Sequence, residues 1–166
     1  MSYGGILALS ELKDSVISLK QVDSKLSLWE QFTGDYNSFY GEYKPYSISF
    51  ISNKDALKSK IFDTVEYQAD LYDHNKNLLY DSPFNYIQVE NEYQDTGIRT
   101  VEDVSNKWNP KKKFRIWRGQ IPRDNNKERP RVKTRIMNPW VKITLGNNIP
   151  NRNKMEFHNV YVKYTV

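Results

Sequence analysis

The sequence contains no cysteine and only two histidines, His74 and His158, among its 166 residues. The absence of cysteine excludes disulfide bonds, thiolate metal ligands and cysteine nucleophiles. The sequence therefore does not indicate whether the protein works in an oxidising or a reducing compartment. With so few histidines, the usual pairings of a nucleophile with a base have few members to draw on. We expect a structural role for His158, and we expect Glu90, Glu92 and Asp95 to be solvated loop carboxylates. The sequence therefore argues against an enzyme.

Glycine is also scarce, and none of the seven glycines lies in the spacing of a phosphate-binding loop. Asp73, Asn75 and Asn77 have the spacing of the first ligands of a calcium loop. Leu78 and Phe84, however, stand where such a loop needs a glycine and a bidentate glutamate. A hairpin turn explains these residues better. We expect no metal and no cofactor.

Long apolar runs are missing as well. No segment approaches the roughly 20 apolar residues that a membrane span needs, and the first residues lack the basic segment of a secretory signal. We therefore expect no contact with a membrane. Because the sequence begins so abruptly on apolar residues, it could also be a piece of a longer chain.

Aromatic residues are abundant, at 14% of a chain that is only 38% hydrophobic. Aromatic side chains fit the half-buried surface of a sheet, so this composition favours strands. We expect a mainly β fold, an antiparallel sandwich or a barrel-like domain with long loops and little helix. The length is that of one domain spanning residues 1–166, with residues 1–25 as a part that could form a separate strand segment.

Alternation of apolar and polar residues predicts individual strands, and clusters of Asn, Asp, Ser and Gly predict the turns between them. The segment 6–32 fits helical and strand spacing almost equally, and we interpret it as three short strands. Further strands are predicted at 46–50, 61–72, 78–80, 84–89, 141–145 and 155–166. The residues 73–77 are predicted to form the turn of a hairpin, and 90–97 an exposed loop.

Charge is divided unevenly along the chain. Twelve Lys or Arg residues stand against Asp124 and Glu128 between Lys107 and Arg135, a net charge of +10. Residues 1–106 contain nine basic and seventeen acidic residues, a net charge of −8. The modest total of +5 thus conceals an acidic front and a basic back.

The basic stretch alternates cations with apolar residues, so we interpret 111–117 and 131–136 as two strands of one ribbon. Alternate residues of a strand point to opposite faces. Such a ribbon would have an apolar underside and a cationic top that carries one tryptophan. The residues predicted to contact a partner are Lys111, Lys113, Arg115, Trp117, Arg131, Lys133 and Arg135.

Two kinds of partner fit such a surface, and a third would use other residues. Single-stranded nucleic acid would place phosphates along the cations and stack a base on Trp117. Protein is the alternative that we favour, because arginine pairs with carboxylates and this chain supplies many, either on its own fold or on another copy. A glycan is a third alternative, for which Tyr36, Tyr40 and Tyr43 are the candidate residues, although core packing explains these tyrosines at least as well.

An ordered set of short motifs carries a family resemblance. The motifs are FYGEYKPY at 39–46, KIFD at 60–63, NEYQDTG at 91–97, KFRIWR at 113–118, QIPRD at 120–124, RIMNPW at 135–140 and NVYVKYTV at 159–166. From Leu26 to Val166 the chain resembles the C-terminal part of the tail muzzle proteins of crAss-like bacteriophages, also called stabilization proteins, whose role is related to that of the nozzle of short-tailed phages.

The resemblance implies a virion component without enzymatic activity, made in the host bacterial cytoplasm and located at the tail tip. It implies β-rich copies in a ring that takes part in tail assembly and closes the genome exit channel until ejection. The expected partners are other copies and neighbouring tail proteins, with nucleic acid as the less favoured alternative. The chain would then be the C-terminal portion of a longer protein.

Overall fold

The computed structural model of the chain describes residues 6–12, 15–22, 24–104, 107–124, 134–149 and 151–166. Within these ranges the secondary structure consists of strands, without a helix, and no described segment is a helix long and apolar enough to cross a membrane. The prediction of a mainly β fold is confirmed. The strands are β1 Ile6–Leu12, β2 Ser15–Val22, β3 Lys25–Glu30, β4 Ser38–Phe39, β5 Glu42–Tyr43, β6 Tyr46–Ser52, β7 Lys60–Tyr72, β8 Leu78–Leu79, β9 Tyr86–Glu90, β10 Arg99–Thr100, β11 Lys111–Lys113, β12 Ile116–Gln120, β13 Met137–Asn138, β14 Val141–Asn147 and β15 Lys154–Thr165.

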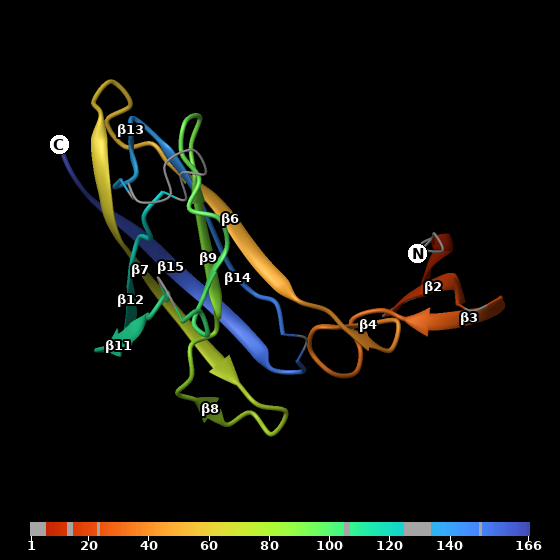
Figure 1. The fold of residues 1–166 in the computed structure, drawn as a ribbon. Helices are drawn as coiled ribbons and strands as arrows, with labels where there is room; N and C mark the ends of the chain where they lie inside the picture. The colour runs from red at the N-terminus through yellow and green to blue at the C-terminus, as the bar shows by residue number, and fades with distance from the viewer. Residues whose placement is uncertain (1–5, 13–14, 23, 105–106, 125–133, 150) are drawn as a thin grey trace.

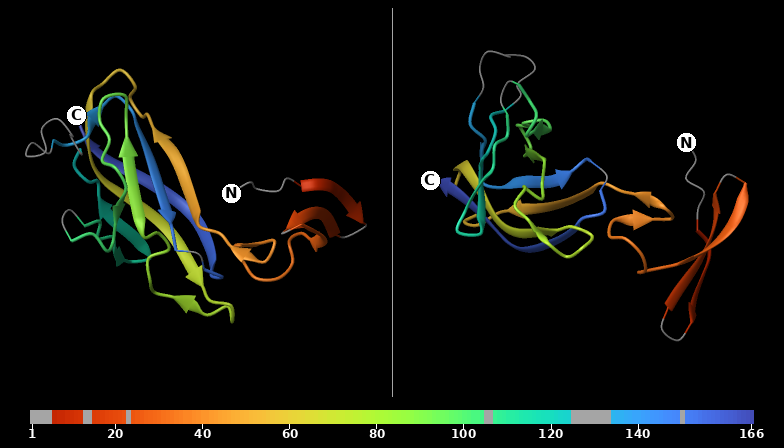
Figure 2. Two further views of the ribbon diagram at one scale, coloured as in Figure 1. Left: turned by 45° about the vertical axis from the view of Figure 1, so that its right-hand side comes forward. Right: turned by 90° about the horizontal axis from the view of Figure 1, so that it is seen from below.

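Two sheets make up the main body of the molecule. The first has the strand order β10-β9-β14-β6. The second is built around the long strand β7, which pairs antiparallel with β15 along its length and with β12, β13 and β8 at successive points. Figure 1 shows β7 and β15 crossing the body side by side, and the right-hand view of Figure 2 shows the two sheets curled around a shared interior.

The core lies between these sheets. It draws on alternate residues of β7, β9 and β14, as expected for strands with one buried face. Several aromatic rings meet at its centre, where Phe84 contacts Tyr67 edge to face at 5.2 Å between centroids. The buried core residues are Phe62, Val65, Tyr67, Ala69, Phe84, Ile87, Val89, Trp108, Trp117, Ile136, Val141, Ile143 and Leu145.

Two irregularities explain why the apolar patterns of β7 and β15 change parity. The pairing of β7 with β15 shifts register between Phe157 and Asn159 and again between Lys163 and Tyr164. The first shift leaves His158 as an extra residue on β15, and the second leaves Asp63 as an extra residue on β7. A bulge of this kind lets apolar residues on both sides of it reach the same core.

The first three strands form a separate sheet, which we call the arm (β1–β3, residues 6–30). Its order is β1-β2-β3, so the prediction of three short strands is confirmed. The arm projects away from the body (Figure 2). Tyr40, from the segment that links arm and body, contacts the ring of Trp29 edge to face at 5.6 Å and lies 3.2 Å from the hydroxyl of Ser18. The division of the chain into domains stays a prediction.

Most of the other predicted strands are present, as β6, β7, β8, β9, β14 and β15. The predicted hairpin at 73–77 is present, and the Asp73 carboxylate accepts hydrogen bonds from the backbone N–H groups of Asn75 and Asn77, both at 2.8 Å. These hydrogen bonds hold the pKa of Asp73 below its ordinary value, and those from Asn77 contribute most. The sequence motif that resembles the start of a calcium loop therefore serves as a turn.

Candidate partner-contact surface

Strand β7 carries a row of carboxylates opposite its core side. Val65, Tyr67 and Ala69 point into the core, so Glu66 and Asp70 point to the other face of the sheet. Asp63 joins them from its bulged position. Each of these three carboxylates forms an ion pair with at least one cationic side chain of a neighbouring strand or loop.

Asp70 lies at the centre of the largest cluster. Its side chain is almost completely buried, and its oxygens lie 3.4 Å from Nη2 of Arg115, 3.9 Å from Nζ of Lys112 and 3.3 Å from Nε2 of His158. A buried carboxylate is stable only when it is paired and hydrogen-bonded. The cluster thus ties the β11–β12 hairpin and strand β15 to β7.

Glu66 is held by two cations at short distance. Nε of Arg118 and Nζ of Lys163 each lie 2.7 Å from its Oε1. The hydrogen bond from Lys163 contributes most to lowering the pKa of Glu66 below 4.5, against the opposing effect of burial. Glu66 is therefore ionised at neutral pH and links β12, β7 and β15 across one sheet.

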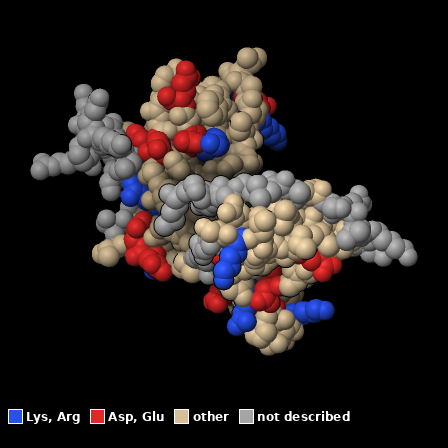
Figure 3. All heavy atoms as spheres, turned by 90° about the vertical axis from the view of Figure 1, so that its right-hand side faces the viewer, with Lys and Arg blue, Asp and Glu red and all other residues tan. Residues whose placement is uncertain are grey.

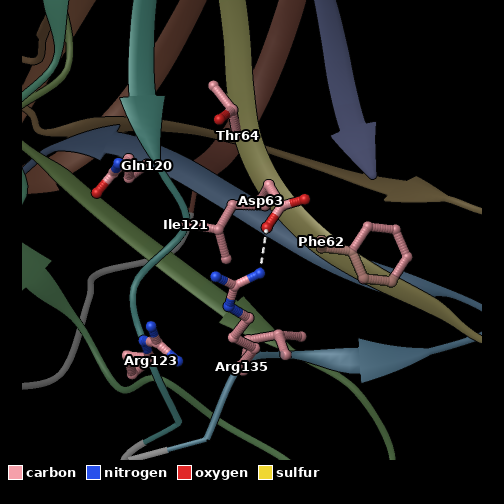
Figure 4. A pocket seen from close by; sticks show the side chains of 8 residues that line it. Phe62, Asp63, Thr64, Gln120, Ile121, Arg123 and Arg135 are labelled. Carbon is pink, nitrogen blue, oxygen red and sulfur yellow. Dashed lines mark hydrogen bonds and ion pairs between the residues drawn. The ribbon is translucent and has the colours of Figure 1, made fainter. Parts of the chain in front are cut away.

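Asp63 completes the row at the far end of β7. Its carboxylate accepts a hydrogen bond from Thr165 at 3.0 Å and lies 3.4 Å from Nη1 of Arg135. Figure 4 shows this pair among the residues that line a small cavity of about 140 Å³, which Arg123 also lines. The ion pair is half exposed, so its contribution to stability is small.

The strand predicted over residues 111–117 is wrong. Of the second predicted strand, 131–136, the first three residues lie outside the described residues, and 134–136 form no strand. Residues 111–117 form no single strand: β11 and β12 are the two sides of a hairpin, in which Lys112 faces Trp117. Phe114 and Arg115 form its turn, with φ angles of 51° and 65°. Positive φ at both central residues matches the twist of a tight hairpin, which explains why the chain reverses here.

Trp117 is buried and does not present its ring to a partner. The side chain is 5% exposed, and the indole stacks on Tyr67 at 6.3 Å between centroids with an interplanar angle of 13°. The ammonium group of Lys112 lies 5.4 Å from the indole. The base-stacking platform of the sequence hypothesis is therefore part of the core.

The remaining predicted contact residues separate into three groups. Arg115 and Arg135 are engaged in ion pairs with β7, and Arg131 and Lys133 lie outside the described residues. Lys111 and Lys113 are exposed, and neither forms an ion pair with a described residue. They line a groove of about 510 Å³ together with Lys107, Asn109, Arg118 and Gln120.

The structure also locates partners that sequence reasoning missed. The carboxylates of Glu66 and Asp70 had a signal, since they fall between the apolar residues of one parity in 61–71. Lys60 had none: its side chain is buried, and its ammonium group donates hydrogen bonds to the carbonyls of Lys54 and Pro139. Several charged side chains of the described residues are therefore paired within the fold.

All three tyrosines considered for glycan binding have intramolecular partners, and for Tyr36 this is the ammonium group of Lys154, 5.6 Å from the centroid of its ring. Tyr40 packs on Trp29 and lies beneath the ammonium group of Lys20 at 4.1 Å. The Tyr43 hydroxyl donates a hydrogen bond to Asp35 at 2.6 Å. Core and loop packing thus accounts for much of this aromatic cluster.

On the face that Figure 3 shows, Lys and Arg lie beside Asp and Glu, and uncharged residues form the larger part of the surface. No group of three or more His, Asp or Glu residues in the described part of the chain could hold a metal ion. A fold of strands whose charged groups join neighbouring strands has the features of a structural β module.

The chain belongs to the family described as the crassvirus muzzle protein C-terminal domain, which matches residues 34–124. It is 43% identical over 167 residues to the "Muzzle protein" of Bacteroides phage crAss001. That alignment covers 99% of this chain and 11% of the relative, so the chain spans about one tenth of the curated relative's length. The resemblance found in the sequence is confirmed.

Proposed function

We propose that the chain acts at the tail tip of the virion as an assembly module without catalytic activity. It takes part in tail assembly and in closing the genome exit channel, through contacts with other copies in a ring and with neighbouring tail proteins. Membership of the muzzle family and the strand-only described fold support this proposal.

The observation that carries the contact proposal is the pair of lysines left over from the internal ion pairs. Arg115, Arg118 and Arg135 neutralise carboxylates of β7, whereas Lys111 and Lys113 face solvent in the groove beside β12. Complementary charge steers and orients protein association. We therefore assign Lys111 and Lys113 to contact with an acidic protein surface.

The test is made on phage particles whose full-length muzzle protein carries Lys111→Glu and Lys113→Glu. We expect particles with missing or displaced tail tips in electron micrographs, and loss of packaged DNA if the tip closes the channel. The control carries Lys58→Glu and Lys76→Glu, two exposed lysines outside the groove and outside β3, and should assemble normally. Intact, infectious particles from the groove variant would contradict the proposal.

A titration with labelled single-stranded DNA at two salt concentrations separates protein contact from nucleic-acid binding. Phosphate contacts make affinity fall steeply with salt. We expect weak binding, because the ring of Trp117 is buried. Tight, salt-dependent binding that is lost in the Lys111→Ala, Lys113→Ala variant would favour nucleic acid instead. Trp117→Ala is unsuitable here, since it would also open the core.

A further inference from the structure

The core of the body is incompletely covered along one side. Nearly all the half-buried apolar residues that pack against it, with the exceptions of Val101 and Ile121, lie on β6 or β15. These two strands belong to different sheets. We call this side the seam; its residues are Tyr46, Ile48 and Phe50 of β6 and Met155, Phe157, Val160, Val162 and Tyr164 of β15.

Both strands that border the seam are edge strands among the described residues. β6 pairs with β14 alone, and β15 pairs with β7 alone. The outer edge of β15 therefore presents backbone N–H and C=O groups with no strand opposite them. Such an edge is a template for the addition of another strand.

The arm presents a surface with matching chemistry. Leu26 and Leu28 lie on the same face of β3, and their side chains are 63% and 74% exposed. The opposite face of the arm is partly covered, where Tyr40 packs on Trp29. Strand β3 also has a free edge, because within the described residues it pairs with β2 alone.

We propose that β3 of one copy docks at the seam of a second copy of this chain. It pairs with the outer edge of β15 and turns Leu26 and Leu28 toward Val160 and Val162. The spacing agrees, since both pairs of residues are two positions apart on a strand and so lie on one face.

We propose a second copy as the partner because the strand that matches the seam, β3, belongs to this same chain but lies away from the seam of its own body. The arm extends away from the body (Figure 2), and the linking segment is fastened near the start of β15, where the Asn37 amide donates a hydrogen bond to the carbonyl of Asn153 at 2.7 Å. The contact joins two different surfaces, so it is heterologous and can continue from copy to copy. It does not use the lysines of the groove.

Site-directed cross-linking tests the contact directly, because the chain has no cysteine of its own. Purified Leu28→Cys and Val160→Cys chains are mixed and oxidised. We expect a mixed disulfide at a yield several-fold above that of the control mixture, Leu57→Cys with Val160→Cys. Leu57 is fully exposed and lies outside both surfaces. A yield equal to the control, or Leu28→Cys homodimers alone, overturns the proposal.

Sedimentation velocity over a range of concentrations provides the second measurement. The unmodified chain should form dimers or larger species that are lost in the Leu26→Ser, Leu28→Ser variant, whose substituted residues are exposed and leave the fold intact. The Lys111→Glu, Lys113→Glu variant should associate like the unmodified chain, which separates this contact from the proposed groove contact. A chain that stays monomeric throughout overturns the proposal and leaves the seam to a different polypeptide.

Discussion

The body and the arm use the same kind of strand in opposite ways. In the body, core residues such as Val65, Ile143 and Leu145 are completely buried between two sheets. In the arm, Leu26 and Leu28 are mostly exposed. Among the arm residues whose burial the structure describes, only Ser18 is buried. A sheet needs a second layer to bury its apolar face. The body supplies that layer itself, whereas the arm does not.

The largest expected difference is between the body and the segment that follows the arm, in the effect of losing an aromatic ring. Phe84→Ala should lower the free energy of unfolding by about 3–5 kcal/mol, because Phe84 is completely buried. Phe32→Ala should change it by less than about 0.5 kcal/mol, because Phe32 is 97% exposed. Urea denaturation followed by circular dichroism measures both. Equal losses would show that Phe32 is covered in solution.

A methyl group added at a glycine tests how closely the body is packed. A Cβ at Gly119 would overlap the indole of Trp108, so Gly119→Ala should cost about 1–3 kcal/mol of unfolding free energy. Gly34, beside the arm, has open space around it but a φ of 85°; its replacement by Ala should cost about 1 kcal/mol through backbone strain. Thermal unfolding of the two variants ranks them, and the reverse order would contradict close packing at Trp108.

The carboxylate of Asp70 is expected to matter more than an exposed one. Asp70→Asn weakens charge-assisted hydrogen bonds around a buried group and should cost about 1–2 kcal/mol, since Arg115 is largely solvated. The control is Glu42→Gln on β5, an exposed residue paired with Lys44, and we expect no measurable change there. Denaturant midpoints at neutral pH provide the comparison. If Asp70→Asn leaves the denaturant midpoint unchanged, the cluster does not contribute to the stability of the fold.

The smallest expected effect is a change in the pH dependence of stability. The folded-state pKa of Glu66 lies below its ordinary value of 4.5, chiefly because Lys163 donates a hydrogen bond to it. Its contribution to stability is therefore present above 4.5 and disappears as the pH falls through the lower, folded pKa. Glu66→Gln should flatten the acid side of the stability profile. If the profile is unchanged in this variant, the loss of stability at acid pH comes from groups other than Glu66.

The sequence predicted elements well where the signal is local. Alternation located β6, β7, β14 and β15, and the Asp73 turn followed from its side-chain chemistry. The β11–β12 hairpin was missed because its turn, Phe114 and Arg115, lacks the Asn-Gly type of signal for positive φ. The chain adopts that turn because Trp117 then pairs with Tyr67 and enters the core.

The sequence by itself determined the strand content, the family and the separation of charge between front and back. Tertiary structure decided which charges meet and which aromatic residue is buried. The reason is that alternation specifies a buried face without specifying the strand beside it, whereas ion pairs such as Glu66 with Arg118 and Lys163 depend on the register of three strands. Bulges at Asp63 and His158 set that register, and a bulge reflects the pairing of two strands rather than the sequence of one.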